Sequence, residues 1–180
     1  MATYFIADTH FGHENIITLC NRPFTDLTDM NTTLAQNWNA RVRDQDDIYI
    51  VGDFWYRGSG DGAVKAAKQL KGRKHLITGN HDKKFLSSPA FQEQFVEVEE
   101  LLSITHDGAR IVLCHYPLAE WEGYYRGSWH IYGHIHNNRN EAFAYMKTQE
   151  RALNAGVEIT QYMPVTFAEL KLYNEIFKNS

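Results

Sequence analysis

Two short motifs far apart in the chain offer metal ligands at alternate positions. Asp8-Thr9-His10 stands near the start, and Gly133-His134-Ile135-His136 lies more than a hundred residues later. At the end of a strand the middle residue of such a triplet points away, so both flanking side chains can turn toward one ion. Three further polar groups lie between the two motifs: Gly52-Asp53, Gly79-Asn80-His81-Asp82 and His115.

Each of these groups follows a short apolar run of the kind that forms a buried strand. The runs are Tyr4-Phe5-Ile6-Ala7, Ile48-Tyr49-Ile50-Val51, His75-Leu76-Ile77-Thr78, Ile111-Val112-Leu113-Cys114 and His130-Ile131-Tyr132. In open α/β sheets, ligands bind at the carboxyl ends of the strands. The sequence therefore predicts one metal site at that edge.

The ligand types indicate which metals the site would take. Asp, His and Asn offer oxygen and imidazole nitrogen, which suit Mn, Fe, Zn, Co or Ni better than a thiolate-selected metal. The candidate ligands number seven: Asp8, His10, Asp53, Asn80, His115, His134 and His136. They are too many for one tetrahedral ion and enough for two ions that share a bridging carboxylate. Two ions about 3.5 to 4 Å apart stabilise the entering and leaving oxygens of a displacement at phosphorus, so we expect phosphoester hydrolysis.

Composition limits the architecture and the partners. With 180 residues, of which 43% are hydrophobic and 22% charged, the chain is expected to form a single globular domain over residues 1–180. The formal net charge of −4 argues against long duplex nucleic acid as a partner. No apolar stretch approaches the roughly 20 residues of a membrane span. We therefore expect neither a membrane nor a long duplex as a partner.

Cysteine usage and the N-terminus indicate the compartment. Cys20 and Cys114 are too few for a disulfide scaffold. The N-terminus runs straight into a predicted strand, without the basic and apolar regions of a secretion signal. We expect a reduced, cytoplasmic compartment.

Three helices are predicted in the first half of the chain, at residues 14–19, 29–43 and 61–70. In the second of these, Met30, Leu34 and Trp38 recur four residues apart and would form one buried stripe. Asp29 and Asp61 are the expected N-caps of the second and third helices. Strands and helices thus alternate, which predicts parallel pairing with right-handed crossovers.

The second half of the chain has a different pattern. Residues 97–105 and 110–114 flank Asp107-Gly108, which predicts an antiparallel hairpin. Apolar residues at 142–145 and 151–155 predict further short strands. Thr166 and Glu169 form a capping box that opens a C-terminal helix through Phe177. Two mixed sheets flanked by helices would account for this order of elements.

The ordered set of motifs over residues 2–160 resembles the calcineurin-like metallophosphoesterase superfamily. The resemblance implies an α/β fold of four layers, an α/β/β/α sandwich, with a dinuclear centre for which Mn is the ion expected first. It implies that the first ion is held by Asp8, His10 and His136. The second would be held by Asn80, His115 and His134, and Asp53 would bridge the two.

The resemblance also implies catalytic roles for His81 and Asp82. His81 would lie over the substrate, where it stabilises transition-state charge or protonates the leaving oxygen, and Asp82 would orient its ring. Related phosphoprotein phosphatases continue Gly-Asp-x-Val-Asp-Arg-Gly, whereas this chain reads Gly52-Asp53-Phe54-Trp55-Tyr56-Arg57-Gly58. Because the second aspartate is missing, a protein phosphatase is not expected. The opening Asp-x-His-x-Gly-His resembles a small bacterial and phage-type subgroup.

Three residues are candidates for contact with the substrate phosphate: His13, Arg22 and Arg57. Arginine can hold phosphate in a bidentate manner, although most arginines are solvated surface residues. His13 could instead be a helix cap or a packed polar group. Aromatic residues in the loops could stack on a nucleobase or simply cover the mouth of the site: Tyr56, Tyr116, Trp121, Tyr124, Tyr125 and Trp129.

Two functional classes remain open from the sequence. One is an enzyme that acts on a small phosphomonoester, a nucleotide or a phosphodiester, and we favour a small phosphorylated substrate. The other is a non-catalytic metal-binding scaffold, as in a retromer subunit that resembles this superfamily. Loss of the leaving-group histidine or of ligands would favour the scaffold. His81 and all seven ligands are present, which favours the enzyme.

Overall fold

The computed structural model of the protein describes residues 1–56 and 60–180, and its strands form two sheets. The first sheet contains β1 (Thr3–Ile6), β2 (Asp47–Val51), β3 (Arg73–Ile77), β4 (Glu97–Glu99) and β9 (Val165–Thr166). The second contains β5 (Leu101–His106), β6 (Ala109–Cys114), β7 (Trp129–Tyr132) and β8 (Ala152–Asn154). The strand orders are β4-β3-β2-β1-β9 and β5-β6-β7-β8. Each sheet has one antiparallel edge strand and is otherwise parallel, so the expected mixed sheets are confirmed.

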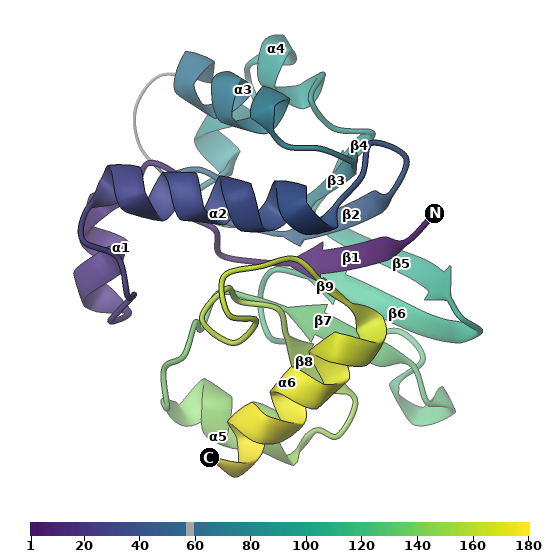
Figure 1. Ribbon diagram of the computed structural model, residues 1–180. Coiled ribbons are helices and arrows are strands. Elements are labelled where there is room, and N and C mark those ends of the chain that lie inside the picture. The colour runs from purple at the N-terminus through teal and green to yellow at the C-terminus, as the bar shows by residue number, and fades with distance from the viewer. Residues whose placement is uncertain (57–59) are drawn as a thin grey trace.

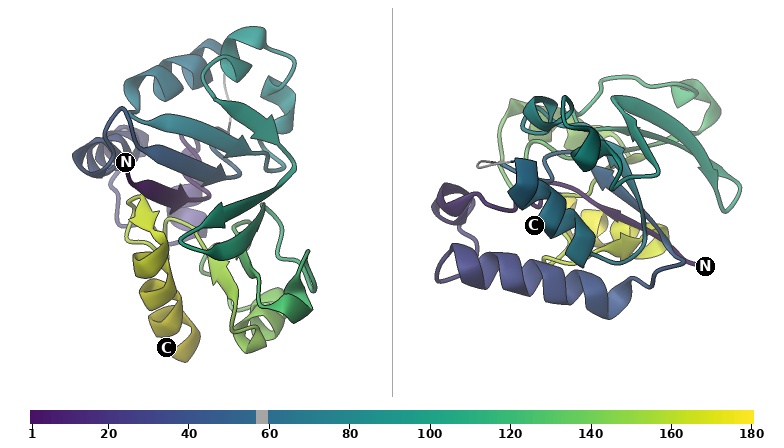
Figure 2. Two further views of the ribbon diagram at one scale, coloured as in Figure 1. Left: turned by 90° about the vertical axis from the view of Figure 1, so that its right-hand side faces the viewer. Right: turned by 90° about the horizontal axis from the view of Figure 1, so that it is seen from above.

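The helices are α1 (Glu14–Leu19), α2 (Leu27–Arg41), α3 (Gly60–Gln69), α4 (Pro89–Gln92), α5 (Glu141–Thr148) and α6 (Phe167–Asn179). Helices α2 and α3 cover one face of the first sheet, and the second sheet lies on the other side (Figure 1). Helix α5 packs on the outer face of the second sheet, and α6 runs alongside that sheet, away from α2 and α3 (Figure 2). The predicted order of helix, sheet, sheet and helix is confirmed.

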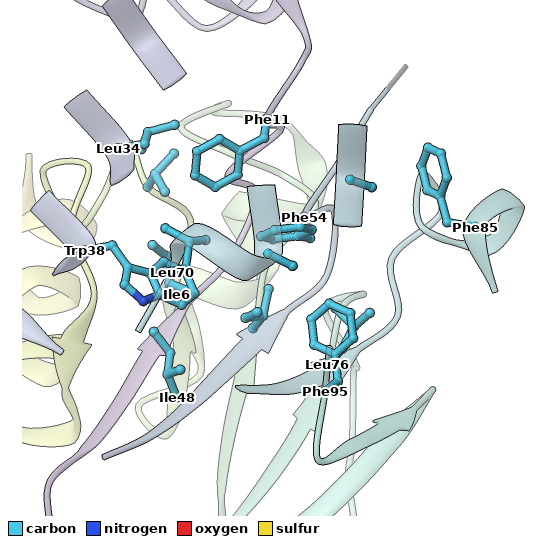
Figure 3. Packing of buried hydrophobic residues seen from close by; sticks show 14 of the residues in the cluster. Ile6, Phe11, Leu34, Trp38, Ile48, Phe54, Leu70, Leu76, Phe85 and Phe95 are labelled. Atoms are coloured by element: carbon cyan, nitrogen blue, oxygen red, sulfur yellow. The ribbon is translucent and has the colours of Figure 1, made fainter. Parts of the chain in front are cut away.

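Alternation along β2 explains why this strand is covered on both faces. Ile48 and Ile50 belong to the cluster formed with α2 and α3, whereas Tyr49 and Val51 face the second sheet. Successive side chains of a strand point to opposite faces, so a strand in the middle layers must be apolar throughout. Trp38 of α2 is fully buried beside Ile48 (Figure 3), and its indole N–H donates to the Lys71 carbonyl at 2.9 Å.

Helix α2 begins earlier than predicted. Its N-cap is Asp26, whose carboxylate accepts a hydrogen bond from the Asp29 N–H at 2.9 Å. Asp29 lies inside the first turn, and its own carboxylate accepts from the Thr25 N–H at 2.9 Å. Helix α3 begins at Gly60, so Asp61 is likewise a first-turn residue rather than the cap. Both aspartates favour a helix start through the helix dipole, which makes cap and first turn hard to distinguish in a sequence.

Two strand predictions in the second half are corrected. Residues 97–105 do not form one strand, because Glu97–Glu99 pairs parallel with β3 in the first sheet and only Leu101–His106 enters the hairpin. Residues 142–145 lie in α5, where the Asn140 side chain caps the helix by accepting from the Phe143 N–H at 3.0 Å. Phe143 and Met146 are three residues apart and both buried, which fits a helix. A window of a few residues is too short to distinguish this spacing from the alternation of a strand.

Among the described residues, none of the helices combines the length and the apolar character that a bilayer crossing needs.

The buried His130 should make the free energy of unfolding depend on pH. Its Nδ1 lies 3.0 Å from the Val112 carbonyl, and burial lowers its pKa from 6.5 to about 4. Between these values the unfolded chain binds a proton that the folded chain does not, so stability falls as pH falls. This group alone should remove about 2 kcal/mol between pH 7 and pH 5. Urea unfolding of the wild type and His130→Gln at both pH values measures it, and an equal pH dependence in the two proteins would show that another group is responsible.

Candidate metal centre

The seven candidate ligands follow strands of both sheets. Asp8 and His10 follow β1, and Asp53 and Asn80 follow the parallel strands β2 and β3. In the second sheet, His115 follows β6, while His134 and His136 follow its parallel neighbour β7. Backbone hydrogen bonds join these strand ends, including His10 N–H to the Asp53 carbonyl at 2.9 Å and Gly133 N–H to the His115 carbonyl at 3.0 Å. The chain therefore brings all seven to neighbouring loops.

Left-handed backbone conformations turn these side chains toward one another. Five ligands have positive φ values, namely Asp8 at 56°, His10 at 51°, Asp53 at 54°, His134 at 70° and His136 at 49°. A non-glycine residue in this region costs on the order of 1–3 kcal/mol and persists only where surrounding structure enforces it. Such a concentration of left-handed residues in one place is typical of a functional site.

Glycines allow the loops to approach the carboxylates closely. A Cβ atom on Gly79 would lie 2.1 Å from Asp53 Oδ1, and one on Gly133 would lie 2.6 Å from Asp8 Oδ2. Both distances are below 3.0 Å, which a real Cβ atom essentially never shows to a non-bonded neighbour. The glycines in the two motifs are thus required by packing against the acidic ligands.

The ligand atoms form two groups that meet at Asp53. Atoms of Asp8, His10 and His136 lie within 4.8 Å of one another. In the second group, Asn80 Oδ1 lies 3.3 Å from His115 Nε2 and 3.1 Å from His134 Nδ1. Asp53 Oδ2 lies 3.5 Å from His10 Nε2 and 3.4 Å from His115 Nε2. One carboxylate therefore faces both groups, as a bridging ligand must.

The burial and bonding of these groups fit a divalent cation. His10 Nε2 is buried and has no hydrogen-bond partner among the residues that the structure describes. Asp8 and Asp53 are also almost fully buried. A buried lone pair and two buried carboxylates are costly to keep out of water unless a cation compensates them. The oxygen and nitrogen donors suit Mn, Fe, Zn, Co or Ni.

Neighbouring groups fix the ring orientation of three histidines. The Nδ1 atom of His115 lies 3.0 Å from the Val51 carbonyl, and that of His10 lies 3.3 Å from His13 Nδ1. His136 Nδ1 lies 3.1 Å from Glu158 Oε1. When Nδ1 is occupied by such a partner, Nε2 is the atom left to bind a metal.

His81 lies at the mouth of the centre. Its side chain is 33% exposed, and its Nε2 lies 3.8 Å from Asp53 Oδ2. Its ring packs edge-on against Tyr56 at a centroid distance of 4.7 Å, and burial lowers its pKa. The backbone N–H of His81 donates to Asp53 Oδ1 at 2.9 Å. The ring is thus accessible to a substrate that approaches the metal ligands.

Asp82 does not orient the ring of His81, which corrects the expectation from the resemblance. Its carboxylate is fully buried and accepts hydrogen bonds from the N–H groups of Asp53 at 2.8 Å, Phe54 at 3.0 Å and Gly79 at 2.9 Å. Burial raises its pKa to about 6. Asp82 therefore holds together the two loops that carry Asp53 and His81.

The three candidate phosphate contacts have different outcomes. His13 is buried, stacks on Tyr56 and lies against His10, so it supports a ligand. Arg22 is wrong as a phosphate contact, because its side chain is inaccessible and donates to Glu158, Thr9 and Asp8. Arg57 lies outside the described residues.

Of the six loop aromatics, Tyr56 and Tyr116 lie at the centre. Tyr116 is 40% exposed and packs edge-on against His134 at a centroid distance of 4.8 Å. Trp121 and Tyr124 pack together against the second sheet, Trp129 packs against Phe167, and Tyr125 donates to Glu120. These four residues therefore pack elsewhere in the fold, and neither stacking on a substrate nor covering of the mouth is observed for them.

The model of the calcineurin-like phosphoesterase superfamily domain matches residues 1–171. The chain belongs to this family. Among relatives of the chain, the uncharacterized protein MJ1445 of Methanocaldococcus jannaschii is 36% identical over 164 residues, which cover 91% of the chain and 85% of MJ1445. The Gene 66 protein of Mycobacterium phage L5 is 36% identical over 83 residues, which cover 44% of the chain and 39% of the phage protein.

A solved structure has a similar fold. The protein of unknown function AQ665 from Aquifex aeolicus superposes with a TM-score of 0.75 at 32% sequence identity, covering 94% of this chain and 97% of AQ665. The similarity therefore extends over nearly the whole of both chains. The names of these relatives state no substrate.

Proposed function

We propose that this protein hydrolyses phosphoesters with the help of two divalent metal ions. The observation that carries the proposal is the position of Asp53, whose Oδ2 atom faces His10 Nε2 at 3.5 Å and His115 Nε2 at 3.4 Å. Asp8, His10 and His136 would hold the first ion, and Asn80, His115 and His134 the second. When bound, such a pair supplies activated water and charge stabilisation at phosphorus.

The protein's own groups would orient the substrate and handle the proton. The His81 ring is accessible at the mouth, where its Nε2 can donate a proton to the leaving oxygen or stabilise charge that develops there. His10, His115 and His136 have their Nδ1 atoms occupied by neighbouring groups, which keeps their rings in place. The site thus combines preorganised ligands with an accessible ring at His81, as general acid catalysis requires.

The substrate that fits best is small. The formal net charge of −4 disfavours a long duplex. Tyr56 and Tyr116 present aromatic rings beside His81 and His134, and such rings can stack on the base of a nucleotide. A phosphomonoester, a nucleotide or a small phosphodiester would each fit this chemistry, and Mn is the ion we propose first.

Metal content and activity test the proposal together. Protein stripped of metal and reconstituted with Mn should bind two ions per chain by elemental analysis. It should then hydrolyse p-nitrophenyl phosphate, bis(p-nitrophenyl) phosphate or a nucleotide from a panel, and a chelator should abolish this activity. A reproducible content of one ion or fewer at saturating Mn would contradict the dinuclear centre. Two ions without hydrolysis of any phosphoester in the panel would favour the scaffold.

A further inference from the structure

Arg22 and Glu158 form a buried ion pair next to the candidate metal centre. Their side chains are 0% and 2% exposed. Arg22 directs two donors to the same oxygen, Glu158 Oε1, from Nε at 2.9 Å and from Nη2 at 2.7 Å. The two residues are 136 positions apart in the chain. The pair therefore joins the segment after α1 to the segment after β8.

The guanidinium group also holds the loop that carries two candidate ligands. Arg22 Nη2 donates to the Asp8 carbonyl at 2.8 Å, and Nη1 donates to the Thr9 carbonyl at 3.0 Å. Asp8 and His10 both have left-handed backbone conformations, with φ values of 56° and 51°. The planar guanidinium group has its N–H donors in a fixed arrangement, which suits it to binding two successive carbonyls in such a strained turn. Arg22 thus sets the backbone of the first motif.

The carboxylate group holds the third ligand of the same ion. Glu158 Oε1 lies 3.1 Å from His136 Nδ1, where it accepts the ring N–H. A carboxylate that accepts from a metal-ligating histidine fixes its tautomer and orientation and makes it a stronger ligand. Among the described residues, Arg22 and Glu158 make no hydrogen bond to Asn80, His115 or His134. Their contacts with the centre are confined to the first group of ligands.

Stability alone is a poor reason to keep this pair. Moving two charges out of water costs several kcal/mol for each ion, and well-packed apolar residues of similar volume are often as stable or more so. Besides Glu158, the acceptors of Arg22 within the described part of the chain are the Asp8 and Thr9 carbonyls and the Met30 sulfur. The position of the pair is therefore explained better by its contacts with the Asp8 loop and His136 than by a contribution to the stability of the fold.

We propose that Arg22 and Glu158 are positioning residues that set the affinity of the first metal ion and leave the second unchanged. This inference rests on the proposed dinuclear centre. Outer partners of metal ligands typically change metal affinity by about 10- to 100-fold when they are removed. The affinity for the first ion should therefore fall by this factor when the pair is replaced, while the affinity for the second stays at its wild-type value.

The test compares metal titrations of the wild type and the charge-neutral double variant Arg22→Met/Glu158→Leu. Calorimetric titration with Zn²⁺ should show two tight ions in the wild type and one in the variant. The isosteric Glu158→Gln replaces the double variant if the latter does not fold by circular dichroism, and it should weaken the first ion in the same sense. The control is Arg41→Met/Glu169→Gln, which changes another Arg–Glu pair, with contacts of 2.6 and 2.7 Å, that lies on the surface. The control should bind both ions as the wild type does.

Nitrogen NMR of the histidines identifies which ion is lost. In the Zn²⁺-loaded wild type, His136 should be protonated at Nδ1 and ligated through Nε2. In the double variant, His10 and His136 should lose the metal-bound shift, while His115 and His134 keep it. Equal affinities and unchanged histidine signals in the variant would overturn the positioning role.

The wild-type titration separates this inference from the proposed function. Two ions in the wild type uphold the dinuclear centre, whatever the variant shows. A single ion would contradict that centre, and the positioning role would then stand only if the variant lost that ion; no ion at all would overturn both. Atoms of Cys20, His136 and Glu158 also lie within 4.8 Å of one another. A thiolate-to-cobalt absorption band in Co²⁺-loaded protein that disappears in Cys20→Ser would show that Cys20 binds an ion beside Glu158, and it would overturn the positioning role.

Discussion

Replacement of Asp53 by Asn should abolish phosphoester hydrolysis while the fold survives. Asp53 Oδ2 faces His10 Nε2 at 3.5 Å and His115 Nε2 at 3.4 Å, so this carboxylate oxygen lies within reach of both ligand groups. Asn has the same shape but no negative charge, and its NH₂ group cannot bind a cation. The loss of kcat should exceed the roughly 10²- to 10³-fold that follows removal of a single stabilising donor in other enzymes.

Activity and metal content should be measured on the same Asp53→Asn sample. Both ions should bind more weakly than in the wild type, whereas changes at His10 or His136 should directly weaken only the first. Asp107→Asn is the matched control, since Asp107 lies in an exposed turn away from the centre and its side chain is 82% exposed. Near-normal activity of Asp53→Asn at low metal concentration would show that Asp53 does not bridge.

Replacement of His81 by Ala should lower kcat by about 10²- to 10⁴-fold on a substrate with a poor leaving group, as expected for loss of a general acid or charge stabiliser. The effect should be smaller on a nitrophenyl ester, because nitrophenolate leaves without protonation. Metal content should stay the same, since His81 lies at the mouth with its Nε2 3.8 Å from the nearest Asp53 oxygen.

The comparison of two leaving groups in one variant separates chemistry from binding. His106→Gln controls for removal of a histidine, because His106 lies in β5 and packs against Phe5 and Phe167 away from the ligands. Loss of an ion from His81→Ala would make His81 a ligand. Unchanged rates on both substrates would show that it has no catalytic role and would favour the scaffold.

The convergence of the ligand loops followed from the sequence for a simple physical reason. All seven candidates stand directly after apolar runs that form parallel strands, and the ends of parallel strands meet at one edge. The distances between the ligand atoms and the burial of these side chains depend on loop conformations that the motifs do not specify. The left-handed backbone of Asp53 and His136, for example, is visible only in the structure.

Support for the ligands could not be predicted in the same way. Glu158 lies outside every motif, and its partners Arg22 and His136 are 136 and 22 residues away. Arg22 looked like a phosphate contact because burial of an arginine has no local signal in a sequence. Asp82 stands beside His81 in the chain but bonds to the backbone of Asp53 and Gly79. The role of Asp82 was therefore predicted wrongly because it is adjacent to His81 in the sequence. The role of Glu158 was missed because its partners are far away in the sequence.

The pairing of β9 with β1 has a consequence for biosynthesis. β1 is synthesised about 160 residues before its antiparallel neighbour at Val165–Thr166. Domains tend to fold as units during synthesis, and here one edge of β1 stays unpaired until Val165–Thr166 has been synthesised. The ion pair between Arg22 and Glu158 likewise cannot form until Glu158 has been synthesised. The loop that carries Asp8 therefore has its full set of contacts only after both Glu158 and β9 have been synthesised.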